Sequence, residues 1–300
     1  MLAEWARVAP QAALEYVRKS MPKDRQAEAL TTVFEAWAGQ DPAAAWDWVL
    51  TRENGDAGHL RSVLTEVAKT SPATAQRFAD AYAVEHPDLA SNAYLAALDG
   101  VMDAGDYAGA QRMIELSKVP NEEQRNILFN FLAGEWARYQ PENAAQWVLS
   151  LPAGPVRTQA LDAVGQAWSD TDPARAADFA VNLPTGPERQ TALAQAISKW
   201  SITDPVRAGE WVLQYNAHGD FDQAVAAIAT SSDFMNHNVG LALGWAGTIQ
   251  QEGLRRQSTI AVLSTWYSND PVSALSYINN SAEVAADVRQ ELLKILPAHN

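Results

Sequence analysis

The chain has 300 residues, a formal net charge of −14 and no cysteine. The lack of cysteine excludes disulfides, thiolate catalysis and cysteine-ligated metals. The negative charge argues against nucleic acid and anionic membrane surfaces, which bind lysine and arginine. No apolar run reaches the roughly 18 residues of a membrane-spanning helix, so we expect no membrane insertion of this segment.

One pattern recurs nine times along the chain, at intervals of 30 to 35 residues. Each copy has an anchor residue, usually proline, followed three residues later by alanine. Large side chains stand five residues before the anchor and six residues after it. The anchors are Pro10, Pro42, Pro72, Tyr107, Pro141, Pro173, Pro205, Val239 and Pro271. A period in this range is typical of a solenoid of stacked helical hairpins.

The first residues already belong to a repeat, because Trp5 occupies the position of a second helix whose hairpin partner is absent. We therefore expect residues 1–300 to be a single repeat domain and a fragment of a longer protein. The apolar edge at this N-terminal repeat is one candidate surface for a homodimer.

Each anchor predicts the start of the first helix of a hairpin. Aspartate before proline caps free amides, and proline at the first helical position loses no hydrogen bond. Pro173, Ala176 and Phe179 then lie on one helical face. The turn at 183–187 contains two prolines and a glycine and ends this helix, and a second helix is expected from Arg189 to Lys199.

Some turns depart from this pattern. The second hairpin has a longer inner turn at 51–58, and the seventh has its inner turn at 216–220. A polar segment at 231–238 reads as a linker between the seventh and eighth hairpins. Together these elements predict an all-α, right-handed superhelix of about nine helical hairpins.

The opening of each unit resembles a tetratricopeptide repeat. Asp41-Pro42 with Ala45 and Trp48 fits this resemblance, and so does Asp204-Pro205 with Ala208 and Trp211. The complete unit is similar to the tryptophan-rich helical-hairpin repeats of uncharacterised bacterial proteins. The resemblance implies protein or peptide binding on a concave surface and carries no catalytic residue. It leaves the compartment open, since periplasm and cytoplasm are both compatible with this composition.

Ten of the eleven tryptophans occupy the two recurring columns of large side chains, where we expect them in the core. Trp46 falls outside these columns, and we expect it to be the exposed aromatic residue. An exposed indole can stack on a sugar ring, which keeps a polysaccharide ligand open as an alternative.

The position five residues after each anchor should face away from the core. It is occupied by Glu15, Asp47, Arg77, Arg112, Gln146, Asp178, Glu210, Gly244 and Ser276, which we call the ladder. If first helices line the concave side, as the resemblance implies, the ladder forms a charge-patterned groove for an extended peptide. The candidate partner-binding residues are Trp46, Asp47, Arg77, Arg112, Gln146, Asp178 and Glu210. The alternative is an ordinary solvated face.

Four arginines stand near the starts of second helices: Arg25, Arg157, Arg189 and Arg255. A cation there opposes the helix dipole. We expect each to pair with a capping aspartate or a loop carbonyl of an adjacent hairpin, the alternative being a solvated side chain.

No catalytic motif is apparent in the chain. The five histidines lack the spacing of metal ligands, and there is no phosphate loop or nucleophile turn. The sequence therefore favours a non-catalytic scaffold or adaptor that binds a protein or peptide, without cofactor or metal. Two alternatives remain: a helical toroid that binds or degrades a polysaccharide, and a structural spacer or self-assembly module.

Overall fold

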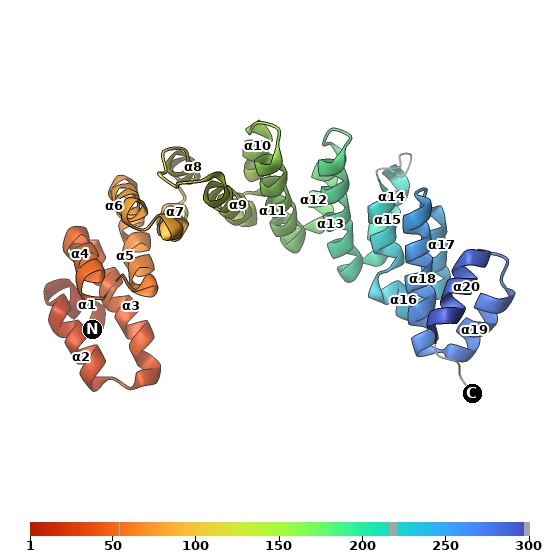
Figure 1. Ribbon diagram of the computed structural model, residues 1–300, viewed down its shortest axis with the longest axis horizontal. Coiled ribbons are helices and arrows are strands. Elements are labelled where there is room, and N and C mark those ends of the chain that lie inside the picture. The colour runs from red at the N-terminus through yellow and green to blue at the C-terminus, as the bar shows by residue number, and fades with distance from the viewer. Residues whose placement is uncertain (54, 216–220, 297–300) are drawn as a thin grey trace. The chain divides into compact units, whose positions relative to one another are not determined.

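The computed structural model describes residues 1–53, 55–215 and 221–296. These residues form twenty α-helices and one short 3-10 helix, η1 (Pro87–Leu89), and no strand (Figure 1). The seventh inner turn, at 216–220, lies outside the described residues. The chain divides into two compact units, Met1–Trp136 and Ala137–Asn300, with the boundary inside helix α9. The all-α, solenoid-like fold that the repeat predicts is confirmed.

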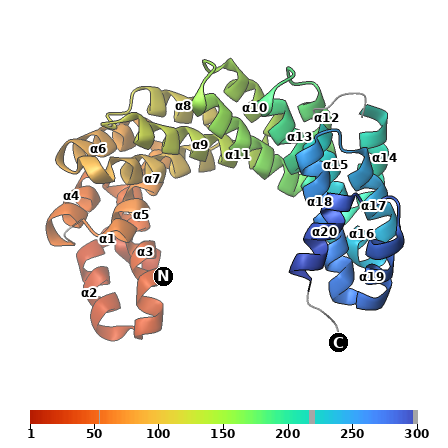
Figure 2. The same ribbon diagram turned by 45° about the vertical axis from the view of Figure 1, so that its right-hand side comes forward.

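The first unit consists of a single helix followed by helical hairpins. Figure 2 shows α2 and α3 as antiparallel helices joined by a short turn. The helices are α1 (Leu2–Val8), α2 (Pro10–Ser20), α3 (Lys23–Gln40), α4 (Pro42–Arg52), α5 (Ala57–Thr70), α6 (Pro72–Glu85), α7 (Ala90–Asp103), α8 (Tyr107–Glu115) and α9 (Glu122–Tyr139).

The second unit continues the same hairpin pattern. Its helices are α10 (Pro141–Ser150), α11 (Pro155–Thr171), α12 (Pro173–Val181), α13 (Pro187–Thr203), α14 (Pro205–Tyr215), α15 (Asp222–Ala229), α16 (Ser232–His237), α17 (Val239–Thr248), α18 (Glu252–Asn269), α19 (Pro271–Asn280) and α20 (Ala286–Ile295). Among the described residues, no helix combines the length and apolar character needed to cross a bilayer.

All nine anchors are the first residues of helices, as predicted. The alanine three residues after each anchor is buried in every hairpin, with at most 5% of its surface exposed. Its small side chain lets the first helix pack closely against its neighbours. The residue seven positions after the anchor lies on the same face and is also buried throughout, as Val49, Val148 and Ile278 illustrate.

A single residue separates each first helix from the helix before it in most hairpins. At the sixth anchor this residue is Asp172, whose backbone N–H donates to the carbonyl of Trp168 (2.8 Å) and ends α11. The carboxylate of Asp172 accepts from the backbone N–H of Arg175 (3.1 Å) and caps α12. Asp41, Asp204 and Asp270 do the same at their anchors. We call this arrangement the junction turn.

The two columns of large side chains meet across the junction turn. Ring centroids lie 5.5 Å apart for Trp5 and Tyr16, 5.1 Å for Trp168 and Phe179, and 5.4 Å for Trp266 and Tyr277. Trp37–Trp48 and Trp200–Trp211 form the same pair, at 5.6 and 6.3 Å. Tilted aromatic pairs at these distances stabilise beyond their buried area. These five junctions are therefore fixed by a hydrogen-bonded turn and by a ring contact.

The structure differs from the predictions at one inner turn and at one connection between hairpins. Helix α13 begins at Pro187 rather than Arg189, because Gly186 adopts a φ of 155° and ends the turn directly before the proline. The expected polar linker at 231–238 contains a helix, α16, and its Phe234 is buried. Phe234 occupies the column of large side chains before the eighth anchor, so a short helix is needed to bring it into the core.

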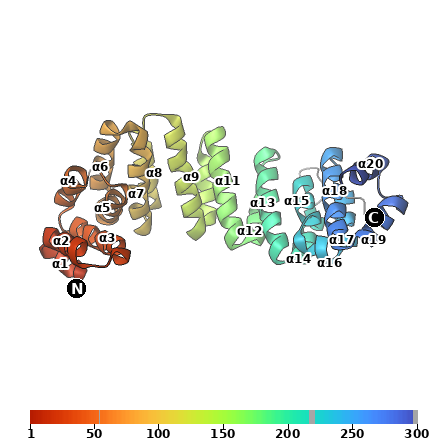
Figure 3. The ribbon, with the colours of Figure 1, turned by 60° about the horizontal axis from the view of Figure 1, so that its bottom comes forward.

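Within each unit, the second helices form the closely packed row. In the first unit α5 packs against α3 and α7, and in the second unit α13 packs against α11 and α15 (Figure 3). Successive first helices, such as α10 and α12, have no comparable contact among the described residues. The ladder therefore belongs to the more widely spaced row. Its expected place on the inner, concave side is not supported by this spacing.

Ion pairs connect neighbouring second helices. Arg61 pairs with Asp99 between α5 and α7. Arg157 pairs with Glu188 (3.2 Å), and Lys199 with Asp170 (2.6 Å), between α11 and α13. These partly exposed pairs contribute modestly to stability, but they specify which hairpins lie side by side.

The four arginines near helix starts behave differently from one another. Arg157 pairs with the carboxylate of the next hairpin rather than with a capping aspartate. Arg255 donates to the carbonyls of Ile249 (2.8 Å) and Gln250 (3.3 Å) in its own inner turn. The guanidinium of Arg189 lies 5.9 Å from the ring centroid of Phe221. Arg25 has no such side-chain contact in the part of the chain that the structure describes.

Candidate functional site

All nine ladder residues are exposed, as predicted, while their helical neighbours two positions before and after them are buried. This alternation follows from the helical period, since a buried stripe at three and seven residues after the anchor leaves position five on the opposite side. The ladder is therefore a set of solvent-facing side chains on the first helices of both units.

Several ladder side chains already have partners within the chain. The carboxylate of Asp178 accepts a hydrogen bond from Nε1 of Trp211 on the next hairpin (2.8 Å). Glu15 pairs with Lys19 one helical turn later. Arg112 lies 3.9 Å from the carboxylate of Asp106. Asp178 thus has a structural role in addition to its exposure.

Trp46 is not exposed, and this prediction is wrong. Only 7% of its surface is accessible, and its ring stacks on Phe78 with centroids 5.0 Å apart and an interplanar angle of 5°. Tyr82 packs against its edge. Trp46 stands four residues after its anchor, a position that shares the buried face with positions three and seven. Leu14, at the same position of the first hairpin, is buried as well.

Arg77 lines a cavity of about 400 Å³ on α6, together with Asp80 and Lys118. Asp80 accepts a hydrogen bond from the hydroxyl of the fully buried Tyr94 (2.5 Å), and Nζ of Lys118 lies 3.8 Å from its second oxygen. Burial and the bond to Asp80 raise the pKa of Tyr94, so its hydroxyl remains a donor at neutral pH. The network joins α6, α7 and the segment after α8.

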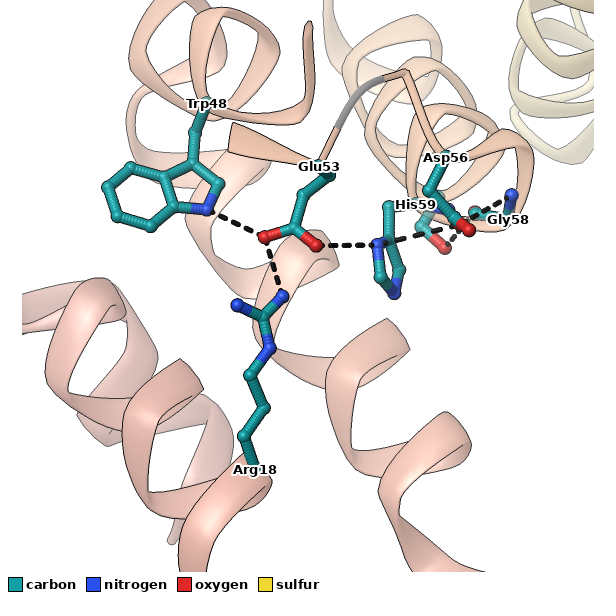
Figure 4. Close-up of polar contacts among 7 residues, drawn as sticks. Arg18, Trp48, Glu53, Asp56, Gly58 and His59 are labelled. Atoms are coloured by element: carbon teal, nitrogen blue, oxygen red, sulfur yellow. Dashed lines mark hydrogen bonds and ion pairs between the residues drawn. The ribbon is translucent and has the colours of Figure 1, made fainter. Parts of the chain in front are cut away.

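A second polar network surrounds Glu53 at the end of α4. Figure 4 shows the side chains of Arg18, Trp48 and His59 converging on this carboxylate. Arg18 donates to Oε1 at 2.5 Å, Nε1 of Trp48 donates to the same oxygen at 3.1 Å, and Nδ1 of His59 lies 3.6 Å from Oε2. Asp56 caps α5 beside this group by accepting from the backbone N–H of His59 (3.0 Å).

The electrostatics of Glu53 reflect these contacts. Burial alone would raise its pKa, but the hydrogen bonds from Arg18 and Trp48 and the charge of Arg18 lower it below the ordinary value of 4.5. The carboxylate is therefore ionised over the physiological range and connects the first two hairpins. Because its oxygens are already engaged by side chains of the protein, this network reads as a structural element rather than a ligand site.

The second unit contains a larger cavity, of about 710 Å³, between α17, α18 and the segment from α19 to α20. We call it the α17–α20 groove. Its lining comprises Val239, Gly240, Leu243, Gly244, Gly247, Glu252, Arg255, Arg256, Thr259, Trp266, Tyr277, Glu283, Val284, Ala285, Asp287 and Val288. Volumes of 300–1,000 Å³ are usual for ligand pockets. A smaller cavity, of about 240 Å³, lies between α11 and α13.

The sequence analysis did not predict the groove, although one residue of its lining belongs to the ladder. Gly244 is a ladder residue, and Trp266 and Tyr277 were expected in the core, where both are only partly buried. The clue in the sequence is that α17 carries glycine one, five and eight residues after its anchor, where the other first helices carry larger side chains. Among the described residues, no group of three histidine, aspartate or glutamate side chains is placed to hold a metal ion.

The comparisons with known proteins give no family assignment. No protein-family model matches the chain, and neither the curated proteins nor the solved structures contain a significant match.

Proposed function

We propose that this chain is a non-catalytic scaffold that binds a protein or peptide, as the tetratricopeptide-like repeats that its sequence resembles do. The observation that carries the proposal is the ladder, whose residues are exposed in all nine hairpins while the alanine two positions earlier is buried in each. Side chains held at a regular spacing on packed helices form a rigid, pre-ordered surface, which reduces the entropy that binding would cost.

The charges of the ladder support a charged partner. In the first unit Glu15 and Asp47 precede Arg77 and Arg112, so acidic and basic positions follow one another along the row. Such patterns favour specificity and association rate more than raw affinity. The alternative of a polysaccharide ligand relied on an exposed Trp46 together with carboxylates of the groove, and the burial of Trp46 removes the first of these two supports.

Affinity capture tests the proposal. The immobilised chain is exposed to proteins of its source cell and washed at low and high salt. We expect one dominant polypeptide, released by salt, and about threefold or greater loss of capture with the Arg77→Ala/Arg112→Ala double variant.

The matched control for capture is Arg7→Ala/Arg207→Ala, which removes two exposed arginines outside the ladder. Equal capture by both double variants would refute the ladder as the binding surface. Capture of no polypeptide would refute the scaffold function.

A further inference from the structure

The α17–α20 groove is open because no side chain among the described residues fills it. Apart from the nearby backbone of α17 itself, no described atom lies within 4 Å of the place where a Cβ would stand at Gly244 or Gly247, and the same holds for Gly240. Gly209 on α14 shows the contrast. A Cβ at Gly209 would stand 2.9 Å from the ring of Trp245, which packs against this helix from the next hairpin. On α17 the space beside the three glycines is left open.

The floor of the groove is apolar and partly aromatic. Trp266 and Tyr277 stand with ring centroids 5.4 Å apart at 53°, and both remain partly accessible. Val284 and Val288 close the floor from the side of α20 and belong to the C-terminal core. A large apolar side chain entering the groove would therefore contact two rings and an aliphatic wall.

The rim carries carboxylates that lack a cationic partner. Glu252 has no hydrogen-bond or ion-pair partner among the described residues, and Glu283 accepts from the neutral hydroxyl of Tyr277 (2.6 Å). The two rim arginines are already engaged. Arg255 donates to backbone carbonyls, and Arg256 pairs with Asp287 (3.0 Å) and with a second carboxylate of α20. The lining holds three carboxylates, Glu252, Glu283 and Asp287, against these two arginines, so its net charge is negative.

We propose that the α17–α20 groove binds a peptide segment of a partner protein in which a large apolar side chain stands next to lysine or arginine. The apolar side chain packs on Trp266 and Tyr277, and the cation lies between Glu252 and Glu283. The bare backbone of α17 at Gly244 lets the peptide backbone approach the helix closely. This inference rests on the proposed scaffold function and adds a site beside the ladder residue Gly244, with the chemistry of its ligand.

The test begins with a random peptide library displayed on phage and selected on the full chain. Enriched peptides are synthesised, and their binding to the wild type and variants is measured by fluorescence anisotropy. We expect enrichment of leucine, phenylalanine or tryptophan beside lysine or arginine, and weaker binding in high salt. Gly244→Trp, which fills the groove from an exposed helical position, should weaken binding at least tenfold. Glu252→Gln and Glu283→Gln should each weaken it about three- to fivefold.

Val206→Trp is the matched control, because Val206 is an exposed residue of the first helix α14 and lies outside both the ladder and the groove lining. It should bind the peptides as the wild type does. Circular dichroism should show that both tryptophan variants keep the helical content of the wild type. The two glutamine variants add independent support, since they change charge without adding volume.

Each other outcome overturns the inference in a distinguishable way. Peptides that bind wild type and Gly244→Trp equally well would place the binding surface elsewhere and leave the scaffold function standing. Selection of acidic or purely polar peptides would refute the chemistry assigned to the ligand. Self-association of the wild type that Gly244→Trp removes would assign the groove to a second copy of the chain. Failure to enrich any peptide would count against the scaffold function as well.

Discussion

Gly100 in α7 provides the sharpest test of how closely the second helices pack. A Cβ at this position would stand 2.0 Å from the carbonyl oxygen of Thr65 and 2.7 Å from Cβ of Ala68, both on α5. An ordinary contact begins near 3.4 Å, so Gly100→Ala requires this Cβ and the carbonyl oxygen of Thr65 to move apart by about 1.4 Å. The obstacle is backbone, which no change of rotamer can move aside.

The expected effect of Gly100→Ala is the difference of two opposing contributions. Overpacking a well-packed core costs about 1–3 kcal/mol, and a backbone clash belongs at the upper end of that range. Alanine in place of a helical glycine stabilises the helix by about 1 kcal/mol. We therefore expect the free energy of unfolding to fall by about 2 kcal/mol.

Urea unfolding followed by far-ultraviolet circular dichroism measures the effect of Gly100→Ala. The matched control is Gly244→Ala, at a helical glycine with open space beside it, which should stabilise the chain by about 0.5–1 kcal/mol. Opposite signs for the two glycine-to-alanine variants are the expected result. A Gly100→Ala variant as stable as the wild type would refute the close approach of α5 and α7.

Substitutions at three further positions test other contacts by the same urea measurement. Asp172→Ala removes the cap of α12 and should cost about 1 kcal/mol, whereas Asp172→Asn should retain most of that stability. Trp211→Phe keeps an aromatic ring but removes the bond to Asp178, and should cost about 1 kcal/mol; no loss would mean that this bond is not formed in solution. Glu53→Gln should destabilise at neutral pH. Because the folded pKa of Glu53 lies below its ordinary value of 4.5, its contribution is present above that pH and is lost as the pH falls through the folded pKa. The difference between wild type and Glu53→Gln should therefore shrink in acid, and a difference that grew would contradict the sign of the shift.

The repeat in the sequence was sufficient to locate every first helix. Proline preceded by aspartate defines both a cap and a first helical turn, and these are local interactions that a sequence shows directly. The burial of alanine three residues after each anchor follows from the helical period. Phe234 is buried, as its place in the column of large side chains predicts, although the residues around it suggested a polar linker. The burial of a large ring outweighed the local polar composition.

The candidate sites were harder to predict, because they depend on contacts between hairpins. Trp46 was expected outside the core because it belongs to neither of the two columns of large side chains, whereas position four shares the buried face with positions three and seven. Glu53 and Arg18 are 35 residues apart, and no local pattern links them. The groove depends on which side chains reach α17 from neighbouring elements, and glycine in a sequence does not reveal whether its space is filled.

The junction turn also determines where this chain can tolerate changes in length. Because one residue separates the two helices, a junction turn cannot accommodate an inserted residue without moving the helix that follows. Each added helical residue would rotate the following hairpin by about 100°. The inner turns span several residues and can lengthen without changing the direction of the helices they join. Labels, tags or guest domains therefore belong in the inner turns, and length variation in evolution should collect there while the junction turns stay fixed in length.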